Sequence, residues 1–142
     1  MKEPESITSA RIPGLGLSAE VEQLAWHGTS VVGVDWLPLA LEGGAEGRSR
    51  GGGAVLIRMA PGCGYPAHRH LGLEHVLVLQ GGYADDHGEH RVGDYVAYPA
   101  GSDHAPVALG DARRPSGPDN PACILYTALA GGIELLEADE VG

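Results

Sequence analysis

The sequence has few basic residues and no long apolar stretch. Its 142 residues include 9 Lys and Arg against 19 Asp and Glu, which gives a formal net charge of -10. Nucleic acids and anionic membrane surfaces both attract clustered positive charge, so we expect neither as a partner. No apolar run approaches the ~20 residues that a membrane-spanning helix needs. The N-terminus lacks the apolar segment of a secretory signal, and we therefore expect a cytoplasmic protein.

Cysteine is also scarce. Cys63 and Cys123 are the only two, too few to define a disulfide framework. In a cytosolic chain both are expected to be reduced and buried. Because Cys63 stands beside a histidine-rich stretch, an extra soft metal ligand or a redox-sensitive thiol are the alternatives for it. A phosphate-binding GxxxxGK[ST] motif is missing as well.

Glycine and proline, by contrast, are abundant, with 23 and 10 residues. They separate short runs of Val, Leu, Ile and Tyr, a pattern typical of turns between strands. We therefore predict an all-β chain forming a single domain over residues 1–142, with a loosely assigned segment 1–20 and a frayed tail 137–142. A short helix or a first strand is expected within 15–24, with Ser18 as a helix N-cap. The expected strands are 24–26, 31–39, 54–59, 68–70, 76–79, 93–99, 104–109, 122–129 and 133–136.

Two polar segments are predicted to connect these strands. Residues 41–53 are glycine-rich and are expected to form a flexible loop. Residues 110–121 are expected to be a solvated excursion, with a lid over a nearby site as the alternative. His27, His87 and His90 fall in or beside predicted turns and are expected to be exposed.

Metal-competent side chains are concentrated in Gly62–Gly81, where His68, His70 and Glu74 lie close together. If residues 68–70 form a strand, both imidazoles project from one face, because side chains alternate along a strand. Two neutral imidazoles and a carboxylate suit a divalent transition metal and not calcium or magnesium. One strand cannot close such a site, and His104 is the expected further ligand.

The alternative, that these side chains are ordinary core residues, is disfavoured because burying them without an ion or hydrogen bonds is costly. Iron(II) and zinc are the first candidates, with nickel, copper or manganese as alternatives. Four protein ligands leave one or two positions open in a five- or six-coordinate ion, whereas a four-coordinate zinc could be structural.

Strand parity after Glu74 predicts the surroundings of the site. Val76 and Val78 share its inward face and are expected to form an apolar pocket floor. Tyr98 and Trp36 are further candidates for the pocket lining.

Outward-facing residues of the same strand are His75, Leu77 and Leu79. Two outward leucines on a central strand need cover. N-terminal strands or a second subunit could supply that cover, and we expect a homodimer.

The spacing of these residues resembles the two sequence motifs of the cupins. The first, G-x5-H-x-H-x3-E-x6-G, is matched by Gly62, His68, His70, Glu74 and Gly81. The second, G-x5-P-x-G-x2-H-x3-N, is matched by Gly93, Pro99, Gly101 and His104, with Ala108 in place of the terminal Asn. That Asn is not a ligand, so its loss leaves the expected site intact.

A narrower resemblance is to the ChrR-type cupins. It rests on the wording of segments 60–62, 65–70, 76–81, 85–88 and 99–106. The resemblance implies a small double-stranded β-helix, or jelly-roll barrel, with one metal ion held by His68, His70, Glu74 and His104. The group includes the C-terminal cupin domain of anti-sigma factors and resembles small non-haem iron dioxygenases that cleave carbon–carbon bonds in β-diketones or aromatic ketones.

Two functions follow from this resemblance. The first is a mononuclear metal-dependent dioxygenase-like enzyme acting on a small carbonyl compound, a β-diketone or hydroxyketone. The second is a non-catalytic zinc-binding sensor or regulatory module that binds a small-molecule ligand. A complete anti-sigma factor is not expected, because the sequence contains no H-x3-C-x2-C motif.

Overall fold

The computed structural model describes residues 7–41 and 52–136. The tail 137–142 and most of the predicted loop 41–53 lie outside the described residues. The all-β prediction is confirmed, because the described residues contain strands and one short 3₁₀ turn, η1 (Ala19–Gln23). No helix in this described part is long and apolar enough to cross a membrane.

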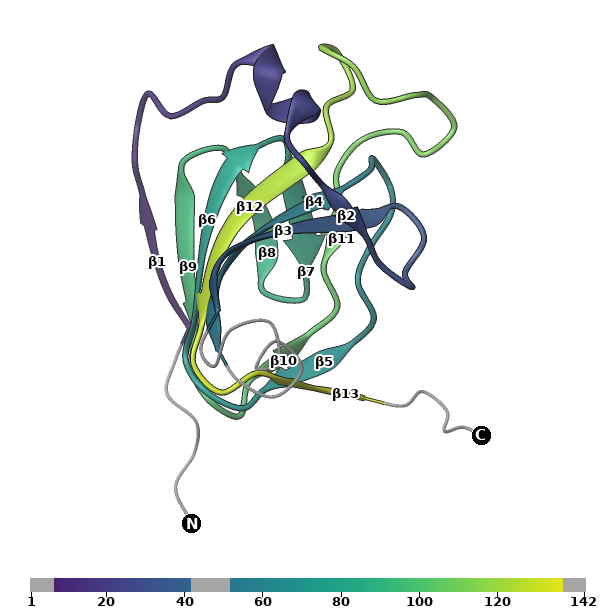
Figure 1. Ribbon diagram of the computed structural model, residues 1–142. Helices are drawn as coiled ribbons and strands as arrows, with labels where there is room; N and C mark the ends of the chain where they lie inside the picture. Colours follow the sequence, from purple (N-terminus) through teal and green to yellow (C-terminus); the bar gives the residue numbers. More distant parts are fainter. Residues whose placement is uncertain (1–6, 42–51, 137–142) are drawn as a thin grey trace.

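A large antiparallel sheet forms one side of the molecule (Figure 1). Its strands, in spatial order, are β1 (Thr8–Arg11), β9 (Asp94–Tyr98), β6 (Glu74–Gln80), β12 (Cys123–Leu129), β4 (Gly53–Met59), β3 (Val34–Leu41) and β2 (His27–Gly28). Strand β12 is central, because it pairs with both β6 and β4 along nearly its whole length.

Two smaller sheets complete the fold. One consists of β10 (Asp103–His104), β5 (His68–His70) and β13 (Ile133–Leu135), and it crosses one end of the large sheet (Figure 1). The other consists of β11 (Val107–Ala108), β7 (Gly82–Asp85) and β8 (Gly88–Arg91) and lies behind the large sheet in that view.

The hydrophobic core lies on the inward face of the large sheet. Val76 and Val78 of β6 are 2% and 0% exposed, whereas Leu77 and Leu79 between and beyond them are only half-buried. The alternation predicted after Glu74 is therefore present. The main buried members of the core are Val34, Met59, Val76, Val78, Tyr83, Val96, Tyr98, Cys123 and Leu125.

The prediction for the N-terminal strands was wrong in their positions along the sequence. The strand expected at 24–26 is not formed, and His27 and Gly28, the first two residues of the turn expected at 27–29, form β2 and pair with β3. The turn follows at 29–33, where the Thr29 hydroxyl hydrogen-bonds the main chain of Val31 and Val34. A threonine side chain that satisfies the main chain in this way stabilises a turn in place of a strand.

The expected short helix within 15–24 is reduced to one 3₁₀ turn. Ser18 stands at its N-cap position but makes no side-chain capping hydrogen bond. The turn buries Val21, and the main-chain carbonyl of Val21 accepts a hydrogen bond from the indole of Trp26.

The polar segment 110–121 is held by a buried side chain. Asn120 is 4% exposed, and its amide nitrogen donates to the carbonyl oxygens of Asp111, Arg114 and Pro115. Its amide oxygen accepts from the N–H of Asp111 at 3.0 Å. These bonds close the segment upon itself.

Candidate metal centre

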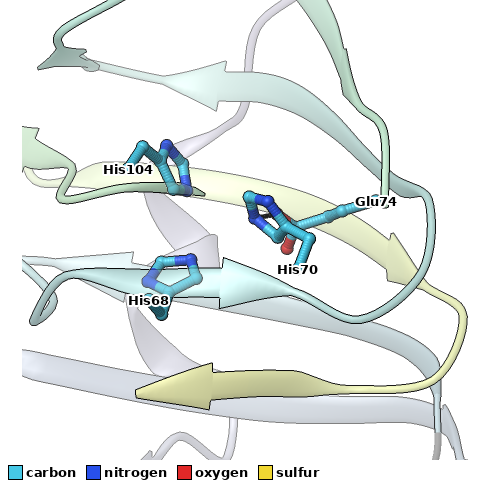
Figure 2. Close-up of side chains that lie close together, drawn as sticks. All are labelled: His68, His70, Glu74 and His104. Atoms are coloured by element: carbon cyan, nitrogen blue, oxygen red, sulfur yellow. Dashed lines mark ion pairs between the residues drawn. The ribbon is translucent and has the colours of Figure 1, made fainter. Parts of the chain in front are cut away.

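The four predicted ligands meet where the small sheet β5–β10–β13 reaches the large sheet. His68 and His70 begin and end β5, Glu74 begins β6, and His104 lies on β10 directly opposite His68. Figure 2 shows their side chains pointing toward one another. One ligand atom from each residue can be chosen so that all lie within 4.8 Å of one another. The structure therefore brings the predicted set together.

Backbone geometry between the two motifs makes this approach possible. Gly101 has a φ of 91°, a conformation that favours glycine, and its N–H donates to the carbonyl oxygen of His70 at 2.8 Å. The turn that precedes β10 is thereby tied to β5, which places His104 beside His68.

Each histidine of the site has its Nδ1 held by a hydrogen-bond acceptor. A carbonyl or carboxylate oxygen can only accept, so Nδ1 carries a proton and Nε2 is the nitrogen left to face a metal ion. All three rings therefore offer Nε2 to a common ion. The three pairs are His68 Nδ1 with Pro66 O (2.9 Å), His70 Nδ1 with Ser102 O (3.1 Å) and His104 Nδ1 with Asp85 Oδ2 (2.8 Å).

The clearest sign of a metal site is a buried nitrogen without a hydrogen bond. His70 is 0% exposed, and its Nε2 has no hydrogen-bond partner. Oε1 of Glu74 lies 2.7 Å from it, marked by the dashed line in Figure 2. This oxygen is close enough for an ion pair but makes no hydrogen bond with the nitrogen. A cation bound by both atoms would satisfy them, so the residues fit a metal ion.

The protonation state of His68 also suits a ligand. Burial lowers the pKa of His68 to about 4, outweighing the hydrogen bond to Pro66 that would raise it. The ring is therefore neutral at pH 7, as metal coordination requires.

A carboxylate that the sequence prediction missed supports the site. The side chain of Asp85 is 0% exposed and accepts hydrogen bonds from His104 and from the hydroxyl of Tyr98, the latter at 2.8 Å. Burial alone would raise the pKa of Asp85, but the hydrogen bonds from His104, Tyr98 and His90 hold it below its usual range. Strand alternation could have indicated this residue, because Asp85 lies two positions after the buried Tyr83 and so shares the inward face of β7.

His90 corrects a second prediction. It was expected to be exposed but is buried, with only 8% of its surface accessible. Its Nε2 lies 3.0 Å from Asp85 Oδ1, and its ring packs on Tyr83. His87 and His27 are exposed, as expected.

The residues predicted to line a pocket lie mostly in the core. Val76, Val78 and Tyr98 are buried, and Tyr98 packs against the rings of His70 and His104 at centroid distances of 5.1 and 4.3 Å. Trp36 is half-buried on β3. Their part in substrate contact stays a prediction.

An open hollow is lined by His104, alone among the four ligands, and by Asp85. It lies between β7 and β10, with Asp86 and Asp103 on its rim and Val107 and Leu136 among its apolar walls. None of the four predicted pocket residues lines this hollow.

Neither cysteine joins the clustered ligands. Both are free thiols; Cys123 is fully buried and Cys63 half-buried. Burial raises the pKa of Cys123 to about 12, which keeps this thiol protonated.

The fold and the site define a metal-binding cupin. The family model of the ChrR Cupin-like domain matches residues 16–113, more than half of the chain, and the chain belongs to this family. No curated protein matches the sequence.

Solved structures show the same fold. A chain of the complex between SigE and the anti-sigma ChrR of Rhodobacter sphaeroides is 28% identical with a TM-score of 0.59; the match covers 77% of this chain and 50% of that chain. The protein thus spans half the length of that relative.

Two further structures are described as acetylacetone dioxygenases, and at their identities they show the fold alone. A putative one from Methylibium petroleiphilum is 15% identical with a TM-score of 0.64, covering 87% of this chain and 82% of that one. One from Acinetobacter johnsonii is 12% identical with a TM-score of 0.59, covering 75% and 66%.

Proposed function

We propose that the chain is a metal-dependent, dioxygenase-like enzyme that acts on a small carbonyl compound, a β-diketone or a hydroxyketone. The observation that supports this most is the convergence of three Nε2 atoms and one carboxylate around a shared point. Such a set holds one ion of iron(II) or zinc and leaves coordination positions for a small chelating molecule.

The protein's own residues have separable tasks in this proposal. His68, His70, Glu74 and His104 would hold the ion, which when bound supplies Lewis acidity toward a carbonyl oxygen and chemistry toward dioxygen. The buried side of the site is closed to water, because Tyr98 packs against two of the ligand rings. The hollow beside His104 provides access from solvent.

The test begins with metal analysis of protein purified without oxygen. Oxygen consumption is then measured with a panel of β-diketones and hydroxyacetophenones. Stoichiometric iron with substrate-dependent uptake supports the proposal, and absence of uptake across the panel counts against it. His104→Ala should lose most of the metal; unchanged metal content would refute the ligand set.

The family match favours a second candidate, a zinc-binding sensor or regulatory cupin. The chain is 28% identical to a chain of the ChrR complex but only 15% and 12% identical to the two dioxygenase structures. Stoichiometric zinc without oxygen uptake would favour this function. Zinc-dependent binding of a partner protein would then be its positive test.

We further propose that a second copy covers the outer face of the large sheet. Five half-buried side chains stand side by side there in register across five strands: Leu37, Leu56, Tyr126, Leu77 and Tyr95. A continuous apolar row of this kind is typical of an interface.

Sedimentation tests this homodimer. The wild type should sediment at twice the mass of one chain, and Leu77→Lys should shift it toward the monomer. Val32→Lys is the matched control, because Val32 is 87% exposed in the turn before β3. A monomeric wild type would overturn this proposal.

A further inference from the structure

We propose that Asp85 is a positioning residue of the metal centre, which holds the ring of His104 in its ligating orientation and gives the centre a second buried negative charge. The inference rests on the metal binding proposed above. It does not depend on whether that metal serves catalysis or sensing.

Both oxygens of this carboxylate are fixed. Oδ2 accepts from His104 Nδ1 at 2.8 Å and from the Tyr98 hydroxyl at 2.8 Å. Oδ1 accepts from His90 Nε2 at 3.0 Å and from the main-chain N–H of His87 at 2.9 Å. Four donors from three strands and a turn leave the carboxylate no freedom to rotate, so the ring bonded to it is fixed as well.

His104 differs in this respect from the other two histidines. The Nδ1 atoms of His68 and His70 face main-chain carbonyl oxygens, which no substitution removes. His104 is oriented by a charged side chain from a different sheet. A carboxylate behind a ligating histidine also raises the basicity of the nitrogen that faces the metal.

Charge balance supports the same role. Glu74 and Asp85 are both largely buried, and among the described residues neither is paired with a lysine or arginine. Buried charges without a counterion are costly. A divalent cation among the four ligands would supply positive charge close to both carboxylates.

The test compares Asp85→Asn with wild type by chelator competition, using zinc and cobalt(II) as the probes. The amide keeps the size of the side chain and one oxygen acceptor but removes the charge. Its NH₂ group also faces N–H and O–H groups that donate hydrogen bonds to Asp85 in the wild type. We expect metal affinity to fall about 10–100-fold and the visible spectrum of bound cobalt to change. Equal affinity and an equal spectrum would overturn the inference.

Ser102→Ala is the matched control. The Ser102 hydroxyl oxygen lies 3.1 Å from His70 Nδ1, but the Ser102 carbonyl oxygen lies at the same distance and remains after the substitution. Affinity should therefore stay within about threefold of wild type, less than the loss expected when an outer partner is removed. An equal loss in both variants would contradict a specific role for Asp85.

A measurement on the unsubstituted protein covers the case in which Asp85→Asn fails to fold. Long-range ¹H–¹⁵N correlation on zinc-loaded wild type should show His104 protonated at Nδ1 and bound to the metal through Nε2. Ligation through Nδ1 would overturn the inference by itself. If the wild type binds neither zinc nor cobalt, the proposed metal centre fails and this inference fails with it.

Discussion

Nε2 of His70 and Oε1 of Glu74 lie 2.7 Å apart across the turn that joins β5 to β6, and this nitrogen has no hydrogen-bond partner. Glu74→Gln keeps the shape of the side chain and removes its charge. We expect zinc affinity to fall by more than the roughly 10–100-fold that loss of an outer hydrogen bond costs.

Chelator competition measures this loss, and thermal unfolding of the metal-free protein serves as the control. Removing the carboxylate charge should leave the metal-free fold at least as stable, because no cation then needs to balance it. Unchanged zinc affinity in Glu74→Gln would mean that this carboxylate is not a ligand.

The pH dependence of stability should reveal His68. Burial lowers the pKa of His68 to about 4 from 6.5. Between these values the unfolded chain binds a proton that the folded, metal-free chain does not. Stability therefore falls as pH drops from about 6.5 to about 4, by up to about 1.4 kcal/mol per pH unit, and this contribution is constant above that window.

Denaturant unfolding in the presence of a chelator, repeated across this pH range, measures the slope. His68→Gln should flatten it, while His27→Gln, which replaces an exposed histidine, should leave it as in wild type. A slope that persists in His68→Gln would assign the effect to other groups.

The sequence predicted the ligands because motif spacing and strand parity are local properties. His68 and His70 share a face by alternation, and Val76 is inward for the same reason as Glu74. His104 was expected because one strand cannot close a site, and the second cupin motif supported it; its pairing opposite His68 on β10 is seen only in the structure.

What the sequence did not predict depends on contacts between segments far apart. Asp85 ends an ordinary strand, β7, and its role appears only when β7 is packed against His104 and Tyr98. His90 was expected to be exposed because turns usually are. Its burial results from the same carboxylate. The turn expected at 27–29 lies at 29–33, because the side-chain hydrogen bonds of Thr29 and not strand propensity decide its position.

The tyrosine pair beside the centre should contribute to the stability of the fold. The hydroxyls of Tyr83 and Tyr98 lie 2.6 Å apart, both rings are 0% exposed, and Tyr98 donates to Asp85. Tyr98→Phe leaves the Tyr83 hydroxyl without a partner and removes one donor from a buried carboxylate. It should lower the free energy of unfolding by about 1–3 kcal/mol.

Tyr83→Phe is the comparison variant. It keeps the bond from Tyr98 to Asp85, so it should cost only about 0.5–1.5 kcal/mol. Denaturant midpoints give both values, and zinc affinity should stay near wild type in Tyr83→Phe, which leaves all four donors to Asp85 in place. A larger cost for Tyr83→Phe than for Tyr98→Phe would show that the hydrogen bond to Asp85 is not the stabilising one.

Asn120 should control the conformation of residues 110–121. Its side chain makes hydrogen bonds to Asp111, Arg114 and Pro115 while almost fully buried. Asn120→Ala leaves these main-chain groups without their partner and should destabilise the fold by about 2 kcal/mol. Trypsin should then cleave faster after Arg113, whose side chain is 90% exposed.

Asp119→Asn is the control, because the 3.1 Å pair of Asp119 with Arg114 is exposed and such pairs contribute about 0–1 kcal/mol. Zinc affinity should be unchanged in both variants, because the hydrogen bonds of Asn120 go to the segment itself and not to the four ligands. Equal cleavage rates in Asn120→Ala and Asp119→Asn would show that another contact holds the segment closed.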